Sequence, residues 1–566
     1  MANIKVYCEN LNSIFDCEPA TSLSELQKRI GYVSEHPVLA AIVDNQLKEL
    51  SFQVYVEHNI KFIDYSHTDG QRTYSRSLNF IVQKAVADLY PQYSLVIDYN
   101  LQNGMYAEIR DLERSENGSH KEIPLSSKEI ETLKKRVQEI IDADLPFTRH
   151  KIKTEEAIKL FKRNNRPEKA LLHELRGKFF TTVYFLDGYA DHFYGPLVPS
   201  TGAIEAWDME FFSKGFLIRT PDVSNPNKIL KTPYQYKLFD VFKEYSNWCN
   251  ILGVSGVGTL NNAINKGMAR ELILIAEGLH ERKYAAIADE IFKRRDKVKL
   301  VLIAGPSSSG KTTTSKRVAL QAKVLGLNPV VIEMDNYFVD RDKTPKDKDG
   351  NLDFESLGAL DTDFLNQQLN DLFEGKTIDL PKFDFAGGVR FFSGEKLTLG
   401  EKDILIMEGI HGLNPALTNH ISADKIFRIY ASALTSLSLD ENNSISTSDN
   451  RLIRRMVRDN QFRGASPESS ILRWPSVRRG EINNIFPYQE NADIMFNSAL
   501  IYELPLLKYF AEPLLRRIPA NSPASTESIR LLKFLSYIVE LQPSEMSHIP
   551  PTSVIKEFIG GSSFIY

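Results

Sequence analysis

A glycine-rich stretch constrains the fold of this chain more than any other feature: GPSSSGKT at residues 305–312 follows an apolar run at residues 299–304 and precedes a helical pattern. A strand, a loop of this form and a helix are typical of a phosphate-binding loop in a parallel α/β sheet. The glycines let backbone N–H groups turn inward around phosphate oxygens, and the helix adds the positive end of its dipole. The residues expected to contact a nucleotide are Gly305, Ser307, Ser308, Ser309, Gly310, Lys311, Thr312 and Thr313.

Two residues of this loop have distinct expected roles. Lys311 would pair with the β- and γ-phosphates of ATP, which makes it a candidate catalytic residue, and the Thr312 hydroxyl would ligate Mg²⁺. The alternative is a Gly/Ser turn followed by an accidental Lys-Thr pair. The strand before the loop and the helix after it favour the nucleotide site.

Two acidic residues follow apolar runs downstream of the loop. Asp335 comes after residues 329–334, and Glu408 closes the run at residues 403–407. Ligands of an open parallel sheet bind at the carboxyl ends of its strands. We therefore expect Asp335 to orient an acceptor hydroxyl and take its proton, and Glu408 to act as a Mg²⁺ carboxylate. A turn-capping aspartate and a strand-end carboxylate that faces water stay open as alternatives.

A predicted helix at residues 450–462 carries a stripe of arginines. Spacings of three and four residues place four of them on one narrow arc, with apolar side chains on the opposite side. These are Arg451, Arg454, Arg455 and Arg458, and Arg463 extends the cluster. Like charges on one arc repel, so we expect the stripe to act as a lid over ATP phosphates. A solvated basic face or, less favoured, a nucleic-acid face are the alternatives.

Further motifs stand in a specific order: DNYF at 335–338, PKFDF at 381–385, Arg390, Glu408-Gly409 and RLIRRMVRD at 451–459. Together with the loop they resemble the uridine kinase/phosphoribulokinase family of P-loop kinases over residues 299–503. The resemblance implies transfer of the ATP γ-phosphate to a sugar hydroxyl of a small molecule, with ATP and Mg²⁺ as cofactors.

The same resemblance implies the roles of individual residues. Asp335 matches the catalytic base, which also contacts the substrate. The remaining matches are Tyr337 and Phe383 as substrate contacts, Asp384 and Arg390 as substrate-ribose and lid-side contacts, Arg458 as a catalytic lid residue, and Arg455 and Arg463 as lid contacts to ATP.

Two positions depart from the family pattern. Uridine/cytidine kinases carry Tyr where this chain has Phe383 and His where it has Gly388. Loss of a hydroxyl and an imidazole removes hydrogen bonds that a polar base would otherwise make. A uridine- or cytidine-type nucleoside is the leading acceptor. Another nucleoside, a phosphosugar or another sugar-like molecule stays open.

The N-terminal half resembles a different family, the N-terminal region of threonyl-tRNA synthetases. Residues 1–65 are similar to a β-grasp TGS domain, and residues 66–215 to the editing domain, through Thr73-Tyr74, Ala85-Val86 and GPLVPSTG at 195–202. The editing residues, an H-x-x-x-H pair and a later Cys and His, are replaced by Arg76, Phe80, Phe193 and Leu197. We therefore expect no hydrolytic editing. A scaffold and a regulatory or RNA- or nucleotide-sensing module are both left open.

The expected architecture is multidomain, because 566 residues exceed what one hydrophobic core supports. Two N-terminal α+β domains precede a helical connector at 216–295, the α/β P-loop kinase-like domain at 296–510 and a helical C-terminal extension at 511–566. A net charge of −4 argues against a chain that wraps nucleic acid. No apolar run predicts a signal peptide or a membrane span, which favours a cytoplasmic enzyme with a small-molecule partner. An ATP-switched RNA- or ribosome-associated regulator is the rival function, and homo-oligomer formation is left open.

Overall fold

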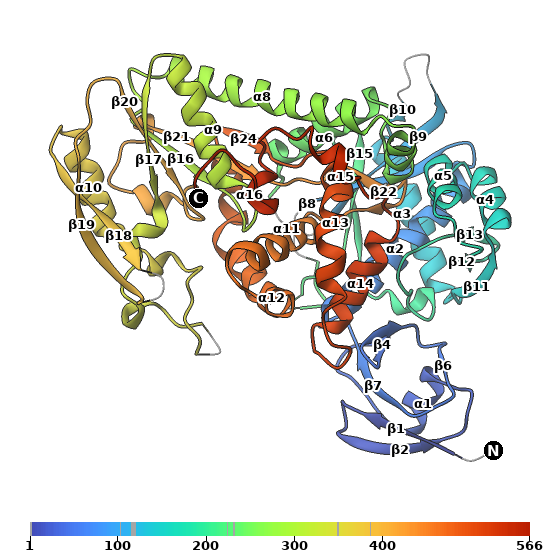
Figure 1. The fold of residues 1–566 in the computed structure, drawn as a ribbon. Helices are drawn as coiled ribbons and strands as arrows, with labels where there is room; N and C mark the ends of the chain where they lie inside the picture. The colour runs from blue at the N-terminus through green and yellow to red at the C-terminus, as the bar shows by residue number, and fades with distance from the viewer. Residues whose placement is uncertain are drawn as a thin grey trace.

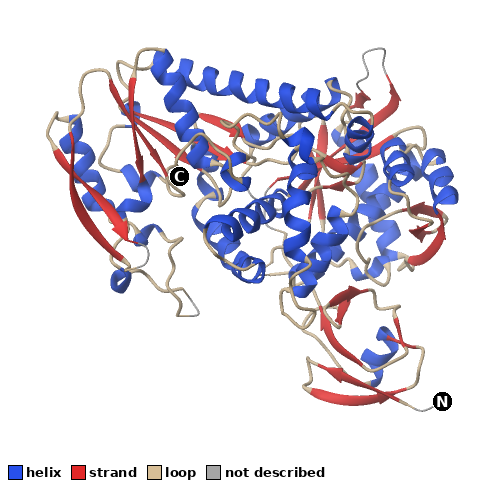
Figure 2. Cartoon of the chain, in the orientation of Figure 1, coloured by secondary structure: helices blue, strands red, loops and turns tan. Residues whose placement is uncertain are grey.

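The computed structural model of the chain describes residues 3–101, 104–114, 120–223, 225–229, 233–347, 350–384 and 387–566. Figure 1 shows the parallel sheet at one side, the N-terminal half at the other, and the first sixty-odd residues protruding below. Helices fill most of the space between the sheets (Figure 2). Among the described residues, no helix has the length and apolar character that crossing a membrane requires.

The first unit is a five-stranded sheet with one helix, α1 (Leu23–Arg29). The helix starts at a capping box in which Ser22 and Glu25 satisfy each other's backbone N–H groups. The sheet order is β2-β1-β7-β4-β5, with β1 and β7 parallel and the other pairs antiparallel. The strands are β1 (Ile4–Cys8), β2 (Ser13–Cys17), β4 (Ala40–Val43), β5 (Gln46–Lys48) and β7 (His58–Ile63), and the short pair is β3 (Thr21–Ser22) with β6 (Gln53–Val54). This is the α+β arrangement expected for the segment, while its TGS identity stays a prediction.

The second unit packs α2 (Thr68–Leu89) and α3 (Ser127–Asp142) against an antiparallel sheet. That sheet contains β8 (Ser94–Leu101), β9 (Gly104–Arg114), β10 (His120–Ile123), β14 (Asp208–Phe212) and β15 (Gly215–Arg219). The smaller sheet contains β11 (Thr148–Lys153), β12 (Phe180–Leu186) and β13 (Tyr189–Asp191), beside α4 (Thr154–Arg163) and α5 (Pro167–Leu175). Because β15 pairs with β9 and β14, residues 216–219 belong to this unit and not to the connector that we expected from residue 216.

The connector consists of α6 (Tyr236–Ile251), α7 (Val257–Asn265) and the long α8 (Ala269–Lys293). It leads into a sheet in which all neighbouring strands are parallel, in the order β17-β20-β16-β21-β24, as the sequence predicts. The strands are β16 (Leu300–Ala304), β17 (Asn328–Glu333), β20 (Asp403–Glu408), β21 (Ile426–Ser432) and β24 (Ile494–Asn497).

Helices cover both faces of the parallel sheet, which explains why its central strands are continuous apolar runs. Val301 and Ile303 pack against α8 and α9 (Lys311–Val324). Leu300 and Leu302 point to the opposite face, against α10 (Thr362–Phe373). An antiparallel hairpin of β18 (Ile378–Asp384) and β19 (Val389–Leu397) lies at the edge of this unit (Figure 1).

The two halves are joined by a short hairpin, β22 (Ser438–Asp440) and β23 (Asn443–Ser444). The buried Glu441 carboxylate at its tip accepts the backbone N–H of Glu168 at 2.8 Å and of Lys169 at 3.2 Å. The Lys169 ammonium is fully buried between Asp191, at 2.5 Å, and Asp440, at 3.6 Å. A segment of the kinase-like unit is thereby anchored inside the second unit.

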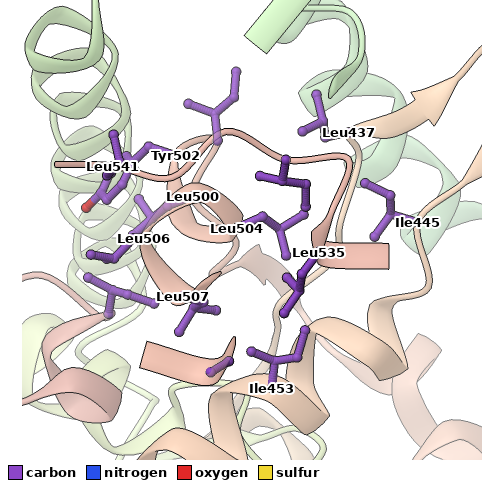
Figure 3. Packing of buried hydrophobic residues seen from close by; sticks show 14 of the residues in the cluster. Leu437, Ile445, Ile453, Leu500, Tyr502, Leu504, Leu506, Leu507, Leu535 and Leu541 are labelled. Carbon is purple, nitrogen blue, oxygen red and sulfur yellow. The ribbon is translucent and has the colours of Figure 1, made fainter. Parts of the chain in front are cut away.

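The largest apolar cluster joins the connector to the C-terminal helices (Figure 3). Its members include Leu504, Leu506 and Leu507, together with Ile453 and Leu535. The helices concerned are α11 (Thr447–Phe462), α12 (Pro467–Asn484), α13 (Glu503–Leu515), α14 (Ser525–Leu535), α15 (Pro543–Met546) and α16 (Lys556–Ile559). Helix α13 crosses the boundary expected at residue 510, so the extension continues the core of the kinase-like unit.

Candidate active site

The glycine-rich loop has the backbone that its sequence predicts. It connects the central strand β16 to α9, and Gly310, at the start of that helix, has φ +83°. A Cβ added at Gly305 would lie 1.9 Å from the Ala431 carbonyl oxygen, and one at Gly310 would lie 2.4 Å from a Val554 methyl. Glycine is therefore required at both positions.

Strand order brings the predicted acidic residues to this loop. Strand β20 lies between β16 and β17, so Glu408 and Asp335 reach the same carboxyl edge of the sheet as the loop. The Thr312 hydroxyl donates to the Glu408 carboxylate at 2.7 Å. The Lys311 ammonium lies 3.4 Å from the Pro306 carbonyl oxygen.

The charges at this edge influence one another. Burial raises the pKa of Glu408 to about 7, and the positive charge of Lys311 opposes this rise. Desolvation also raises the pKa of Asp335, and the positive charge of Lys311 again opposes the rise. The Asp335 side chain nevertheless stays in contact with solvent. Among the described residues, no side chain forms a hydrogen bond or ion pair with the Asp335 carboxylate. Asp335 can therefore accept a proton from an incoming group.

Two arginines of the stripe are structural, which the sequence did not indicate. Arg451 forms an ion pair with Glu481 and Arg454 with Glu503, and all four side chains are at most 2% exposed. Arg451 also donates to the Ser307 carbonyl oxygen at 3.0 Å. Spacing along a helix cannot reveal these carboxylates, because they belong to other segments. These two arginines brace the loop and do not form an open basic face.

The three arginines assigned to the lid gather around one carboxylate, Asp459. Its oxygens lie 3.2 Å from Arg455, 2.9 Å from Arg458 and 3.6 Å from Arg463. The Arg455 guanidinium also donates to the Ser307 hydroxyl at 2.8 Å. The Arg463 side chain is 61% exposed, and its charge opposes the raised pKa of Asp335. The lid arginines thus lie beside the loop and the candidate base.

The predicted acceptor contacts lie on or near the β18–β19 hairpin. Tyr337 is buried, and its hydroxyl donates to Gln368 at 2.9 Å. The Arg390 guanidinium pairs with Asp361 at 2.9 Å and lies 4.5 Å from the centroid of the Phe364 ring. Their contact with an acceptor stays a prediction.

The positions that depart from the family pattern lie on the same hairpin. The Phe383 ring lies 5.7 Å from the Phe338 ring, and Asp384 ends β18, whereas Phe385 is outside the described residues. Gly388 has φ +73°, and a Cβ there would lie 2.7 Å from the Arg341 Nε. The space next to Gly388 is therefore occupied by a guanidinium.

The extension at residues 511–566 carries no motif that indicates chemistry, yet it contacts the loop helix. Glu557 accepts the backbone N–H of Thr313 at 3.2 Å and its hydroxyl at 2.6 Å. The Tyr566 hydroxyl lies 2.9 Å from the same Thr313 oxygen, and the Arg317 guanidinium donates to the Thr552 carbonyl at 2.6 Å. The Glu557 carboxylate thus takes the hydrogen bond of the Thr313 amide, which was expected to contact a phosphate.

The editing-like positions come together in the second unit. Phe80, Phe193 and Leu197 share one apolar cluster, in which the two phenylalanine rings are 5.1 Å apart. Arg76 lies beside them, against Gly195 and 5.7 Å from the Tyr194 ring. Among the described residues, no group of three His, Cys, Asp or Glu side chains is placed to hold a metal ion. The resemblance to an editing domain itself stays a prediction.

Comparison with known proteins agrees with this geometry. Residues 300–501 match the phosphoribulokinase/uridine kinase family. A uridine kinase of Macrococcus caseolyticus is 30% identical over 200 residues, which are 35% of this chain and 87% of that protein. A uridine kinase of Ligilactobacillus salivarius is 30% identical over 36% of this chain and 86% of that protein. A uridine kinase of Deinococcus deserti is 31% identical over 34% of this chain and 84% of that protein. Through this segment the chain belongs to the phosphoribulokinase/uridine kinase family, and it is a phosphotransferase that acts on a hydroxyl group.

Proposed function

We propose that the protein is an ATP-dependent nucleoside kinase of the uridine/cytidine type, which transfers the γ-phosphoryl group of ATP to a sugar hydroxyl. The observation that carries this proposal is the meeting of Lys311, Asp335 and the Thr312–Glu408 pair at one edge of the parallel sheet. The similar proteins named above are uridine kinases, which supports a nucleoside acceptor.

Each residue at this edge has a part in the reaction. The Asp335 carboxylate takes the proton of the acceptor hydroxyl as its oxygen bonds to the γ-phosphorus. The bond from that phosphorus to the bridging oxygen breaks, and ADP leaves with the electron pair. Lys311 stabilises the negative charge on the phosphate oxygens, and the exposed guanidinium of Arg463 lies near enough to Asp335 to do the same. The raised pKa of Asp335 makes it a stronger base than an ordinary aspartate.

The donor set suits a divalent cation. The hydroxyl of Thr312 and the carboxylate of Glu408 are oxygen ligands of the kind that Mg²⁺ prefers. When bound, Mg²⁺ neutralises charge on the phosphates. Burial penalises the negative charge of Glu408, and a cation beside it would offset that penalty.

A second acceptor class, another sugar-like metabolite, is favoured by one observation. The Arg341 guanidinium fills the space beside Gly388, where uridine/cytidine kinases carry a histidine. A cation at this point suits an acceptor with an anionic group better than a neutral pyrimidine.

The test is ADP release from Mg·ATP with a panel of nucleosides, phosphosugars and other sugar-like acceptors. The control is Lys311→Ala, which loses the phosphate-binding ammonium. Turnover of uridine or cytidine by the native protein, absent in the control, is the expected result. Turnover of another acceptor alone would keep the kinase and reassign its substrate. No turnover, together with retained ATP binding and salt-dependent RNA binding, would favour the ATP-switched RNA regulator.

A further inference from the structure

A second group of cations lies outside the kinase site, where three parts of the chain meet. Arg76 comes from α2, Arg149 from β11, Arg176 follows α5, and Lys533 comes from α14 of the C-terminal extension. Contacts link these residues. Arg176 donates to the Ser536 hydroxyl, three residues after Lys533, at 3.4 Å. Arg149 pairs with Glu49, and the Tyr184 hydroxyl contacts both Glu49 and the carbonyl of Gly195, against which Arg76 lies. The charges of all three arginines act on Lys533. We call these four residues the basic cluster.

A carboxylate, that of Glu49 in the first unit, lies beside the basic cluster. Glu49 forms an ion pair with Arg149 at 3.2 Å and accepts a hydrogen bond from the Tyr184 hydroxyl at 2.8 Å. One negative charge is therefore shared between a guanidinium and a phenol. It does not balance the other cations of the cluster.

Arg76 and Arg176 have aromatic neighbours, but neither they nor Lys533 have an acidic partner among the described residues. The Arg176 guanidinium lies 3.8 Å from the centroid of the Tyr537 ring, and the Arg76 guanidinium 5.7 Å from that of Tyr194. Across the part of the chain that the structure describes, no carboxylate forms an ion pair with Arg76, Arg176 or Lys533. The Nε atoms of Arg76 and Arg176 are both buried without a hydrogen-bond acceptor.

This arrangement is unfavourable for the protein alone. Desolvation lowers the pKa of Arg76, and desolvation together with the three arginines lowers the pKa of Lys533 to about 8. Cations that are crowded together without counter-charges repel, and unpaired donors in a desolvated site carry a further penalty. Lys533 and Arg149 are nevertheless exposed, so a solute can reach them.

We propose that the basic cluster is a binding site for a small phosphorylated metabolite. Guanidinium groups bind phosphate oxygens in pairs through their planar fork of N–H donors, and an ammonium adds a point charge. A phosphate dianion or pyrophosphate matches the excess of positive charge better than a single carboxylate does. The cluster is compact and the whole chain has a net charge of −4, which favours a small ligand over an extended RNA.

The site is connected to the kinase unit through α14. Arg530, one turn before Lys533, pairs with Asp449 in the first turn of α11 through contacts of 2.7 and 2.8 Å. Helix α11 carries Arg455, which contacts the phosphate-binding loop. A ligand in the cluster therefore contacts the same helix that positions the start of α11.

Titration calorimetry of the full-length chain with inorganic pyrophosphate tests the proposal. All proteins carry Lys311→Ala, which weakens phosphate binding at the glycine-rich loop. We expect binding that either Lys533→Gln or Arg149→Gln weakens about tenfold or more, since each removes a charged donor from the ligand. Both residues are exposed, so both variants are expected to fold. The matched control is Lys135→Gln, an exposed lysine of α3 outside the cluster.

Three outcomes would overturn the proposal. Pyrophosphate does not bind, or it binds equally well to Lys533→Gln and to the Lys135→Gln control. In the third outcome, pyrophosphate does not bind, whereas a single-stranded RNA binds and does so more weakly to Lys533→Gln. That result would assign the cluster to RNA. Because every protein in the series carries Lys311→Ala, none of these results depends on the proposed kinase activity.

Discussion

The arginine stripe of α11 and the basic cluster are both dense groups of cations, but they differ in their partners. On α11, Arg451 and Arg454 each have a buried carboxylate of their own. In the basic cluster, Arg76, Arg176 and Lys533 have none among the described residues. A buried cation with its own carboxylate belongs to the fold, because loss of either partner leaves a charge without compensation. A cation without one is available to a ligand.

The same contrast applies to carboxylates and gives the largest expected effect. Asp335 has no partner in the described chain, whereas Glu503 is paired and buried. Asp335→Asn should lower kcat about 10²- to 10⁴-fold with little change in thermal stability, because it removes the proposed general base. The measurement is steady-state ADP release with the acceptor found in the panel. Glu333→Gln, at the end of β17, is the control: its charge only helps to raise the pKa of Asp335, so kcat should change far less. An unchanged kcat in Asp335→Asn would remove Asp335 from the role of base.

The paired arginines should show the opposite behaviour. Arg454→Met leaves Glu503 buried and unpaired, so we expect a loss of about 3–5 kcal/mol in the free energy of unfolding. The measurement is the urea midpoint of the full chain. Arg463→Met, whose side chain is 61% exposed, should cost less than about 1 kcal/mol. The double variant Arg454→Met/Glu503→Met should recover most of the loss. Equal midpoints for the two single variants would contradict the distinction between buried, paired cations and exposed ones.

Local motifs predicted the parts of the site that lie at strand ends. The loop at 305–312, Asp335 and Glu408 each follow an apolar strand, and a parallel sheet necessarily gathers such residues at one edge. The expected helix at 450–462 also agrees closely with α11, which spans Thr447–Phe462. These features depend on patterns among residues close together in the sequence, and such patterns can be read from a single sequence.

Long-range pairs could not be predicted in this way. Glu481 lies 30 residues after Arg451, Glu503 lies 49 after Arg454, and Glu557 lies 244 after Thr313. Helical spacing showed that the arginines share a face, but the carboxylates opposite them come from other elements. For the same reason the four members of the basic cluster, spread from α2 to α14, are separate cations in the sequence.

A smaller effect is expected at the contact between the extension and the loop helix. The Glu557 carboxylate accepts from the Thr313 amide and hydroxyl, and its negative charge competes with phosphate for this position. Glu557→Gln keeps the shape and removes the charge, so we expect the KM for ATP to fall by about three- to tenfold, the effect of roughly 1 kcal/mol. Glu540→Gln, in the same extension, is the control. A higher KM in Glu557→Gln would mean that this carboxylate helps to hold the nucleotide site in shape.

The smallest effect tests the basic cluster without any ligand. The pKa of Lys533 is lowered to about 8 by desolvation and by Arg76, Arg176 and Arg149, against the opposing charge of Glu49, while the nearby His192 has a pKa well below its usual range. The folded chain therefore binds this proton less tightly than the unfolded chain, in which a lysine titrates near about 10.4. Below pH 8 the ammonium opposes folding, and this penalty disappears as the pH rises from about 8 to about 10.

Lys533→Gln should accordingly be slightly more stable than the native protein at pH 7, by less than about 1 kcal/mol because the side chain is exposed. The gain should shrink towards pH 9.5, where the native lysine is largely neutral in the folded state. Urea midpoints of both proteins at the two pH values measure this difference, and Lys135→Gln should show no such dependence. If Lys533→Gln is less stable than the native protein at pH 7, the lysine has a stabilising partner. The contrast between the paired arginines of α11 and the unpaired basic cluster would then fail at this residue.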